Sequence, residues 1–116
     1  MQGELTPTST QSAEHYMWGE VCDGWHLLKR DDISVIQERV PPGQSERTHF
    51  HKISRQFFFI LDGEATIVTT SKTIALTKYQ GVEIPPGVPH QVCNKSPEDV
   101  VFLVISFPKS HGDRYY

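Results

Sequence analysis

Residues 43–63 read GQSERTHFHKISRQFFFILDG, and they carry two histidines two positions apart, His49 and His51. Residues two apart on a β-strand point to the same face, so both imidazoles can reach one point in space. Gln56 begins a second apolar segment after a short break, and its amide oxygen can reach the same point. These three side chains form a candidate metal site.

A third histidine extends this candidate site. His90 follows the turn sequence Pro85-Pro86-Gly87, which can bring it opposite the histidine pair in a barrel. Three neutral imidazole nitrogens and one amide oxygen suit Fe(II), Mn(II), Ni(II), Zn(II) or Cu(II), with positions left for water or substrate. The alternative is a set of imidazoles that only hydrogen-bond the backbone at a barrel rim.

The rest of the chain consists of short apolar runs separated by turn signals. We expect strands at 18–21, 25–28, 33–40, 48–51, 56–61, 65–70, 73–76, 82–84, 91–93 and 100–107. The dipeptide Asp23-Gly24 is read as the hairpin turn between the first two. No segment shows a clear 3.6-residue period. This pattern predicts an all-β barrel or sandwich.

The domain organisation follows from length and composition. Residues 1–14 are polar and rich in Ser and Thr, so we expect a flexible tail before one domain at residues 15–116. The formal net charge is −3 with the signs mixed, which argues against a nucleic-acid partner. No run approaches the roughly 18 apolar residues of a membrane span. Without a visible secretory signal, we expect a cytoplasmic protein with no membrane contact.

Two features of the sequence allow more than one interpretation. Cys22 and Cys93 are either buried thiols or one disulfide. With Gln56 facing the interior, Phe57, Phe59 and Leu61 point outward and need cover, from a second sheet layer or from a second copy of the chain. We favour a homodimer.

The histidine segment resembles the first cupin motif. Gly43, five residues, His49-x-His51, four residues, Gln56, six residues and Gly63 fit that motif, with glutamine where glutamate is usual.

The stretch from Tyr79 to Asn94 resembles the second cupin motif. Pro85-x-Gly87, two residues, His90, three residues and Asn94 fit it, although Tyr79 stands where the motif opens with glycine. The resemblance implies a double-stranded β-helix, jelly-roll-like barrel that holds one divalent metal. It carries over His49, His51, Gln56 and His90 as the ligands. The alternative is a decayed site in which Gln56 hydrogen-bonds only the backbone.

Other residues are candidates for substrate binding. Arg47 shares strand parity with both histidines of the pair and could clamp a substrate carboxylate, or could form a rim salt bridge with Glu46. Phe58 and Ile60 share the inward face with Gln56 and are expected to line the pocket, although both would also suit the core. His111, in the C-terminal segment SHGDRYY, has no functional account from sequence.

The predicted function is a metal-dependent cupin enzyme that acts on a small, oxygenated, anionic metabolite. A neutral glutamine leaves the full +2 charge on the metal, which favours Lewis-acid chemistry of isomerase, cyclase, hydrolase or lyase type. The alternatives are a metal-dependent dioxygenase, a non-catalytic module that binds a small ligand or metal, and a structural homodimer. Oxygen consumption with diketones or flavonoids would distinguish the dioxygenase. The sequence names neither substrate, metal nor catalytic acid or base.

Overall fold

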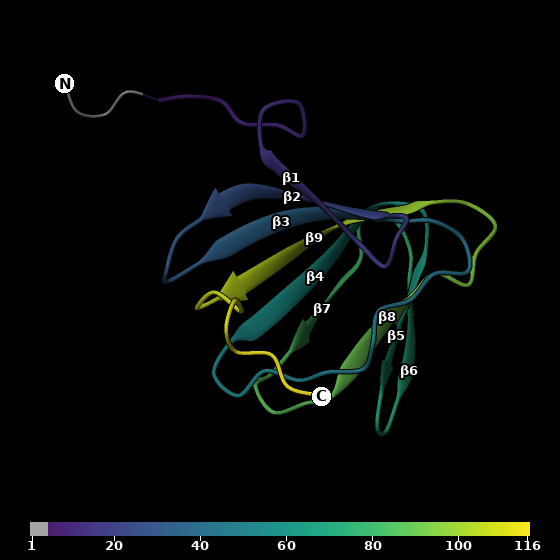
Figure 1. The fold of residues 1–116 in the computed structure, drawn as a ribbon. Helices are drawn as coiled ribbons and strands as arrows, with labels where there is room; N and C mark the ends of the chain where they lie inside the picture. The colour runs from purple at the N-terminus through teal and green to yellow at the C-terminus, as the bar shows by residue number, and fades with distance from the viewer. Residues whose placement is uncertain (1–4) are drawn as a thin grey trace.

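The computed structural model describes residues 5–116, which form two antiparallel β-sheets facing each other (Figure 1). The strands are β1 (Glu14–Trp18), β2 (Cys22–Lys29), β3 (Ser34–Val40), β4 (Arg55–Asp62), β5 (Ala65–Thr69), β6 (Thr73–Leu76), β7 (Gly81–Ile84), β8 (His90–Cys93) and β9 (Val100–Phe107). The all-β prediction is confirmed, and none of residues 5–116 form a helix long and apolar enough to cross a membrane. Part of the predicted tail, residues 1–4, lies outside the described residues, and β1 already begins at Glu14.

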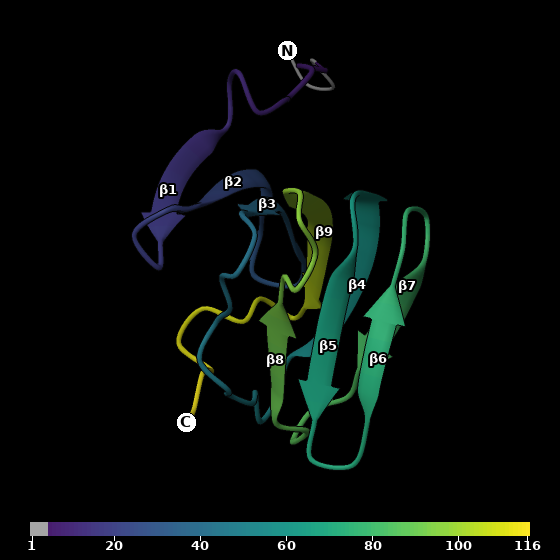
Figure 2. The same ribbon diagram turned by 90° about the vertical axis from the view of Figure 1, so that its right-hand side faces the viewer.

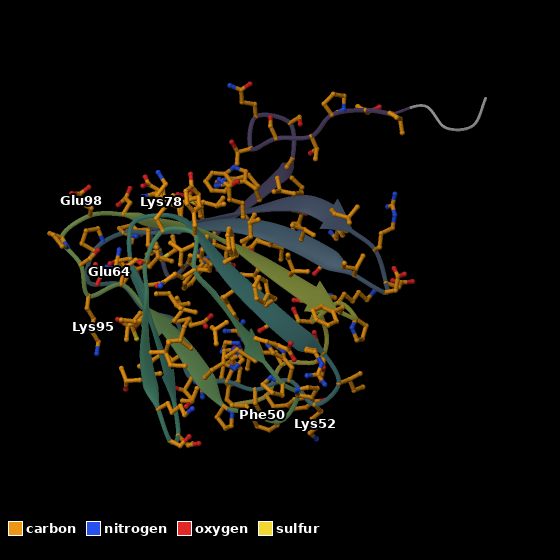
Figure 3. All side chains as sticks on the ribbon, turned by 180° about the vertical axis from the view of Figure 1, so that it is seen from behind. Phe50, Lys52, Glu64, Lys78, Lys95 and Glu98 are labelled. Atoms are coloured by element: carbon orange, nitrogen blue, oxygen red, sulfur yellow. The ribbon has the colours of Figure 1, made fainter. Side chains whose placement is uncertain are left out.

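The larger sheet has the strand order β1-β2-β3-β9-β4-β7, and the smaller has the order β6-β5-β8. The smaller sheet stands in front of the larger one in Figure 2, and residues 41–54 and the C-terminal segment run beside β8. Side chains fill the space between the sheets (Figure 3). Phe50 and Lys52, which flank His51, lie at the open ends of the sheets, away from Glu64, Lys78, Lys95 and Glu98.

Alternation along β4 determines which side chains face the interior. Gln56, Phe58 and Ile60 are 5%, 3% and 1% exposed, as the sequence predicts for the inward face. Phe57 and Phe59 point to the outer face, where they remain partly exposed and their rings stack at 6.2 Å. A second copy of the chain over this outer face stays a prediction. Cys22 and Cys93 are separate buried thiols, which decides against the disulfide.

The predicted hairpin turn at Asp23-Gly24 is wrong. Both residues lie inside β2, and the chain reverses at Gly19-Glu20, between the paired residues Trp18 and Cys22. Gly19 and Glu20 have φ values of 59° and 74°, the left-handed conformation that tight hairpins need.

Gly24 instead makes room for an aromatic ring. The register pairs Tyr16 with Gly24 and Gly24 with Glu38 on the inner face of the sheet. A Cβ atom at position 24 would lie 2.2 Å from Cζ of Tyr16. The missing side chain therefore lets the Tyr16 ring cross β2, and its hydroxyl donates a hydrogen bond to Oε2 of Glu38 at 3.0 Å.

We expect Gly24→Ala to expel the Tyr16 ring and to lower the free energy of unfolding by about 2 kcal/mol, a typical cost of overpacking. Urea denaturation measures this loss. In a Tyr16→Ala background the clash is absent, so adding Gly24→Ala there should cost less than about 0.5 kcal/mol. Equal costs in the two backgrounds would show that the ring does not occupy the space over Gly24.

The predicted strand at residues 48–51 is also wrong, because these residues form no regular strand. These residues form only isolated bridges, His49 with His90 and Phe50 with Tyr115. The backbone of His49 nevertheless exchanges both hydrogen bonds with that of His90, at 3.1 and 2.8 Å. This single bridge is enough to place a histidine of the first motif beside the histidine of the second.

Candidate metal centre

Three histidines meet at the open end of the barrel. His49, His51 and His90 each offer a ring nitrogen, and these three atoms lie within 4.8 Å of one another. The side chains are buried, at 3%, 4% and 0% exposure. His90 begins β8, while the other two lie on the irregular segment that precedes β4. The structure thus brings together all three histidines that the sequence singles out.

Hydrogen bonds fix the orientation of each ring. Nδ1 of His49, His51 and His90 lies 2.9, 2.5 and 2.9 Å from the backbone oxygens of Arg47, Asp113 and Val88, respectively. A ring that donates from Nδ1 presents the lone pair of Nε2, which is the form that binds metal.

Burial keeps these rings neutral. It lowers the pKa of all three histidines, and that of His49 falls to about 3. Nε2 of His51 is buried and has no hydrogen-bond partner among the described residues. A buried nitrogen without a partner costs free energy, and a bound cation would remove that cost. The donor set therefore fits a divalent metal.

Gln56 lies beside the three rings. Its Nε2 donates to Oγ of Ser106 at 3.0 Å, and its Oε1 lies 3.2 Å from Nε2 of His90. Because Nδ1 of His90 donates to Val88, its Nε2 and the amide oxygen are two acceptors that face each other. Two acceptors at this distance suit a cation bound to both, which agrees with Gln56 as a fourth ligand.

The C-terminal segment supports the centre, a role that the sequence did not suggest. The carboxylate of Asp113 accepts hydrogen bonds from the backbone N–H groups of Lys52, Ile53 and Ser54 at 3.0, 2.9 and 2.8 Å. Burial alone would raise the pKa of Asp113, but these three donors outweigh it and hold the pKa below the usual range. Asp113 thus orients the histidine segment twice, through its side chain and through the carbonyl that accepts from His51.

Arg114 is the arginine that reaches the histidines. Its guanidinium lies 3.2 Å from Nδ1 of His49 and 3.7 Å from Oε2 of Glu46. Arg47 is exposed and packs its guanidinium over the ring of Tyr116, 4.0 Å from the centroid. Its predicted salt bridge with Glu46 is not among the ion pairs of the described residues. The contribution of Arg47 to substrate binding stays a prediction.

Two cavities meet at the centre. The inner cavity, of about 100 Å³, is lined by Tyr16, Ile36, Glu38, Glu46, His49, Gln56, Phe58, Val104, Ser110 and Arg114. The outer cavity, of about 760 Å³, reaches His51 and shares four lining residues with the inner one, namely Tyr16, Ile36, Ser110 and Arg114. Phe58 lines the inner cavity, and its role in substrate binding stays a prediction. Ile60 is buried in the core and lines neither cavity, and its predicted role stays untested.

Two glutamates stand inside the inner cavity and were missed by sequence reasoning. Desolvation raises the pKa of Glu38 to about 7. Desolvation, and then the nearby charge of Glu38, raise the pKa of Glu46 to about 8. Strand parity could have found Glu38, because it shares the inward face of β3 with Val40. Nothing in the sequence pattern points to Glu46, which lies on the irregular segment.

The pKa of Glu38 predicts a pH dependence of stability. An unfolded glutamate releases its proton near pH 4.5, whereas folded Glu38 retains it up to about pH 7. The free energy of unfolding should therefore fall between these pH values. Glu38→Gln should remove this contribution. From pH 4 to pH 8 the free energy of unfolding of the variant should therefore rise by about 3 kcal/mol relative to that of wild type.

Urea denaturation of both proteins at pH 4 and pH 8 tests the expectation. Glu83→Gln is the control, because Glu83 is half-exposed on the outer face and pairs with Arg55. A Glu38→Gln variant that retains the wild-type pH dependence would show that Glu38 titrates normally.

Two facing antiparallel sheets with a histidine centre at one end define a double-stranded β-helix barrel. The chain matches the cupin domain family over residues 36–106, more than half of its length, and it belongs to that family.

Three related proteins show how far the similarity extends. An uncharacterized protein of Methanocaldococcus jannaschii is 28% identical over 89 residues, which cover 76% of this chain and 71% of that protein. H2HPP isomerase of Bacillus subtilis is 30% identical over 87 residues, 74% of this chain but only 36% of the isomerase. The polyketide cyclase RemF of Streptomyces resistomycificus superposes with a TM-score of 0.80 at 17% identity, over 91% of this chain and 81% of that chain.

Proposed function

We propose that the protein is a metal-dependent cupin enzyme that rearranges a small, oxygen-rich anion by Lewis-acid chemistry, with an isomerase-type proton transfer as the reaction. The observation that carries this proposal is the unpartnered Nε2 of His51 inside a cluster of three histidine nitrogens. His49, His51, His90 and Gln56 would hold the ion. When bound, a divalent ion polarises a carbonyl group and stabilises the negative charge that develops on its oxygen.

The ligand set supports Lewis-acid chemistry. All four ligands are neutral, so none of them cancels the charge of the ion, and the centre attracts anionic oxygen ligands. The inner cavity also contains Glu38 and Glu46, whose raised pKa values bring them close to neutral pH. Groups that titrate near the working pH are the ones suited to proton transfer.

Arg114 supports an anionic substrate. It lies where the two cavities meet, and its charge is available to a carboxylate in either. The outer cavity is lined by four permanent cations, Lys29, Arg30, Lys109 and Arg114, and by two carboxylates, Glu14 and Asp31. This excess of positive charge favours a ligand that carries a negative group outside the metal centre.

The relatives agree with this reaction class. One is named an isomerase and another a polyketide cyclase, and neither isomerisation nor ring closure requires net oxidation of the substrate. We further propose a cytoplasmic homodimer, because Phe57, Phe59 and Leu103 leave an apolar outer face on the larger sheet.

Isothermal titration with oxalate, a small dianion that can bind a metal through two oxygens, tests the proposal. Oxalate should bind the manganese-loaded protein and should not bind the metal-free protein. Arg114→Gln should weaken this binding about 10–100-fold, the usual cost of losing one charged hydrogen-bond donor.

Arg55→Gln is the matched control, since the side chains of Arg55 and Arg114 are both 41% exposed and Arg55 lies on β4, paired with Glu83. Equal affinity for oxalate with and without metal would contradict the proposal. Oxygen uptake during turnover would instead indicate the dioxygenase, and binding without turnover of any candidate would indicate the non-catalytic module.

A further inference from the structure

The inner cavity holds a tyrosine–glutamate pair that is not part of the metal centre. Tyr16 and Glu38 line this cavity together with His49 and Gln56. Both reach it from the larger sheet, on β1 and β3, opposite the segment that carries the histidine pair. The proposed reaction needs a group that moves a proton, and histidines bound to a metal cannot supply it.

The two glutamates of the cavity differ in how their oxygens are used. Oε1 of Glu46 accepts from the backbone N–H of Val92 at 3.1 Å, and its Oε2 faces Arg114. Glu46 is therefore held by the protein on both sides. Glu38 accepts one hydrogen bond, from Tyr16 to Oε2, and no partner for its Oε1 occurs among the described residues. Oε1 keeps some exposed surface, so it is open to the cavity.

We propose that Glu38, oriented by Tyr16, takes a proton from a substrate in this cavity and returns it to a different atom of the same molecule. This inference rests on the proposed function, because it assumes a substrate with a carbonyl oxygen at the histidine centre. It assigns Tyr16 as a positioning residue, and Gly24 as the residue that lets Tyr16 reach Glu38.

The step balances without any other reactant. The Glu38 carboxylate forms an O–H bond as the C–H bond beside the substrate carbonyl breaks. The C–H electron pair forms a C=C bond, and the carbonyl π pair moves onto the oxygen. In a substrate with a C=C bond next to the deprotonated carbon, the oxygen lone pair then re-forms the C=O bond. The new C=C pair shifts one position along the chain, and the pair of the original C=C bond takes the proton from Glu38 at its far carbon. The product is an isomer of the substrate, and Glu38 returns to its starting state.

The surroundings of Glu38 suit a group that both takes and gives a proton. Desolvation raises its pKa to about 7, while the hydrogen bond from Tyr16 and the charge of Arg114 lower it. The charge of Glu38 in turn raises the pKa of the neighbouring Glu46 and Cys22. A carboxyl near neutral pH is present in both forms, so neither half of the transfer is strongly uphill.

Proton uptake on oxalate binding tests this assignment. A dianion bound beside Glu38 raises the pKa of Glu38, so binding at pH 7.5 should take up a fraction of a proton. Titrating manganese-loaded protein in two buffers with different ionisation enthalpies measures this number. Glu38→Gln should still bind oxalate and should lose most of the uptake, whereas Glu83→Gln on the outer face should keep it.

Tyr16→Phe is the second variant. It keeps the ring over Gly24 and removes only the donor to Glu38, so the pH at which uptake is half-maximal should rise. A residue with a purely structural role would not move this midpoint.

The outcomes separate the two proposals. If oxalate fails to bind the metal-loaded wild type, the proposed function fails and the inference fails with it. If oxalate binds but wild type takes up no proton, or Glu38→Gln takes up as much as wild type, the proposed function stands and the assignment of Glu38 is wrong.

Discussion

Asp113→Ala is expected to lower the free energy of unfolding by about 3 kcal/mol and to weaken metal binding about 10–100-fold. The first effect arises because three backbone N–H groups, those of Lys52, Ile53 and Ser54, lose their shared acceptor. Water cannot replace the lost acceptor at the N–H of Ser54, because Ser54 is only 1% exposed. The second effect arises because the loosened segment carries His51, whose ring is oriented by the Asp113 carbonyl.

Urea denaturation of metal-free protein measures the first effect, and competition with a chromophoric chelator measures the second. Asp99→Ala is the control. The Asp99 carboxylate is 49% exposed and pairs with Arg39 at the surface, so its loss should cost less than about 1 kcal/mol and leave metal affinity unchanged. If the two aspartate variants behave alike, the C-terminal segment does not support the histidines.

His51→Ala should abolish measurable metal binding while the barrel remains folded. Because the substitution removes a ligand itself, it should weaken metal binding more than about 100-fold. That is the upper end of the loss when a residue that only hydrogen-bonds a ligand is removed. The fold should survive because Nε2 of His51 has no hydrogen-bond partner among residues 5–116. A buried polar atom without a partner destabilises the folded state. Its removal therefore offsets part of the packing free energy that is lost with the ring.

Metal titration and far-UV circular dichroism measure the two halves of this expectation. His111→Ala is the matched control, because His111 is exposed and lines the outer cavity but not the inner one. A His51→Ala variant that keeps one equivalent of bound metal would show that the ligand assignment is wrong.

The sequence predicts the barrel well where side chains alternate between two environments. Gln56, Phe58 and Ile60 share a face in the sequence and are buried together in the structure. The spacing of His49 and His51, and the turn before His90, likewise lead directly to the histidine cluster. Along β4 the signal is local, because strand periodicity determines which side chains share a face. His49 and His51 lie instead on an irregular segment, which the single bridge between His49 and His90 aligns with β8.

The contributions that the sequence did not reveal depend on contacts between distant segments. Asp113 binds backbone groups about 60 positions earlier in the chain. A backbone N–H carries no sequence signal, so no pattern shows which carboxylate will accept from it. The wrong prediction at Gly24 has a related cause. Asp-Gly is typical of hairpin turns, but here the glycine lies inside a strand and allows the close approach of Tyr16.

Tyr79 shows how the departure from the second motif is accommodated. It stands where the motif opens with glycine and has a φ of 68°, in the left-handed region that favours glycine. Its ring stacks on Phe59 at 6.5 Å between centroids. The turn therefore keeps a glycine-like conformation, and the stacked ring offsets part of its cost.

The metal content of the protein, purified without chelator or nickel resin, tests the central claim most directly. Elemental analysis against protein concentration should find close to one equivalent of one divalent transition metal, and His51→Ala prepared in the same way should contain none. Wild-type protein that is free of metal and also binds no added Mn(II), Fe(II), Ni(II), Zn(II) or Cu(II) would contradict the claim.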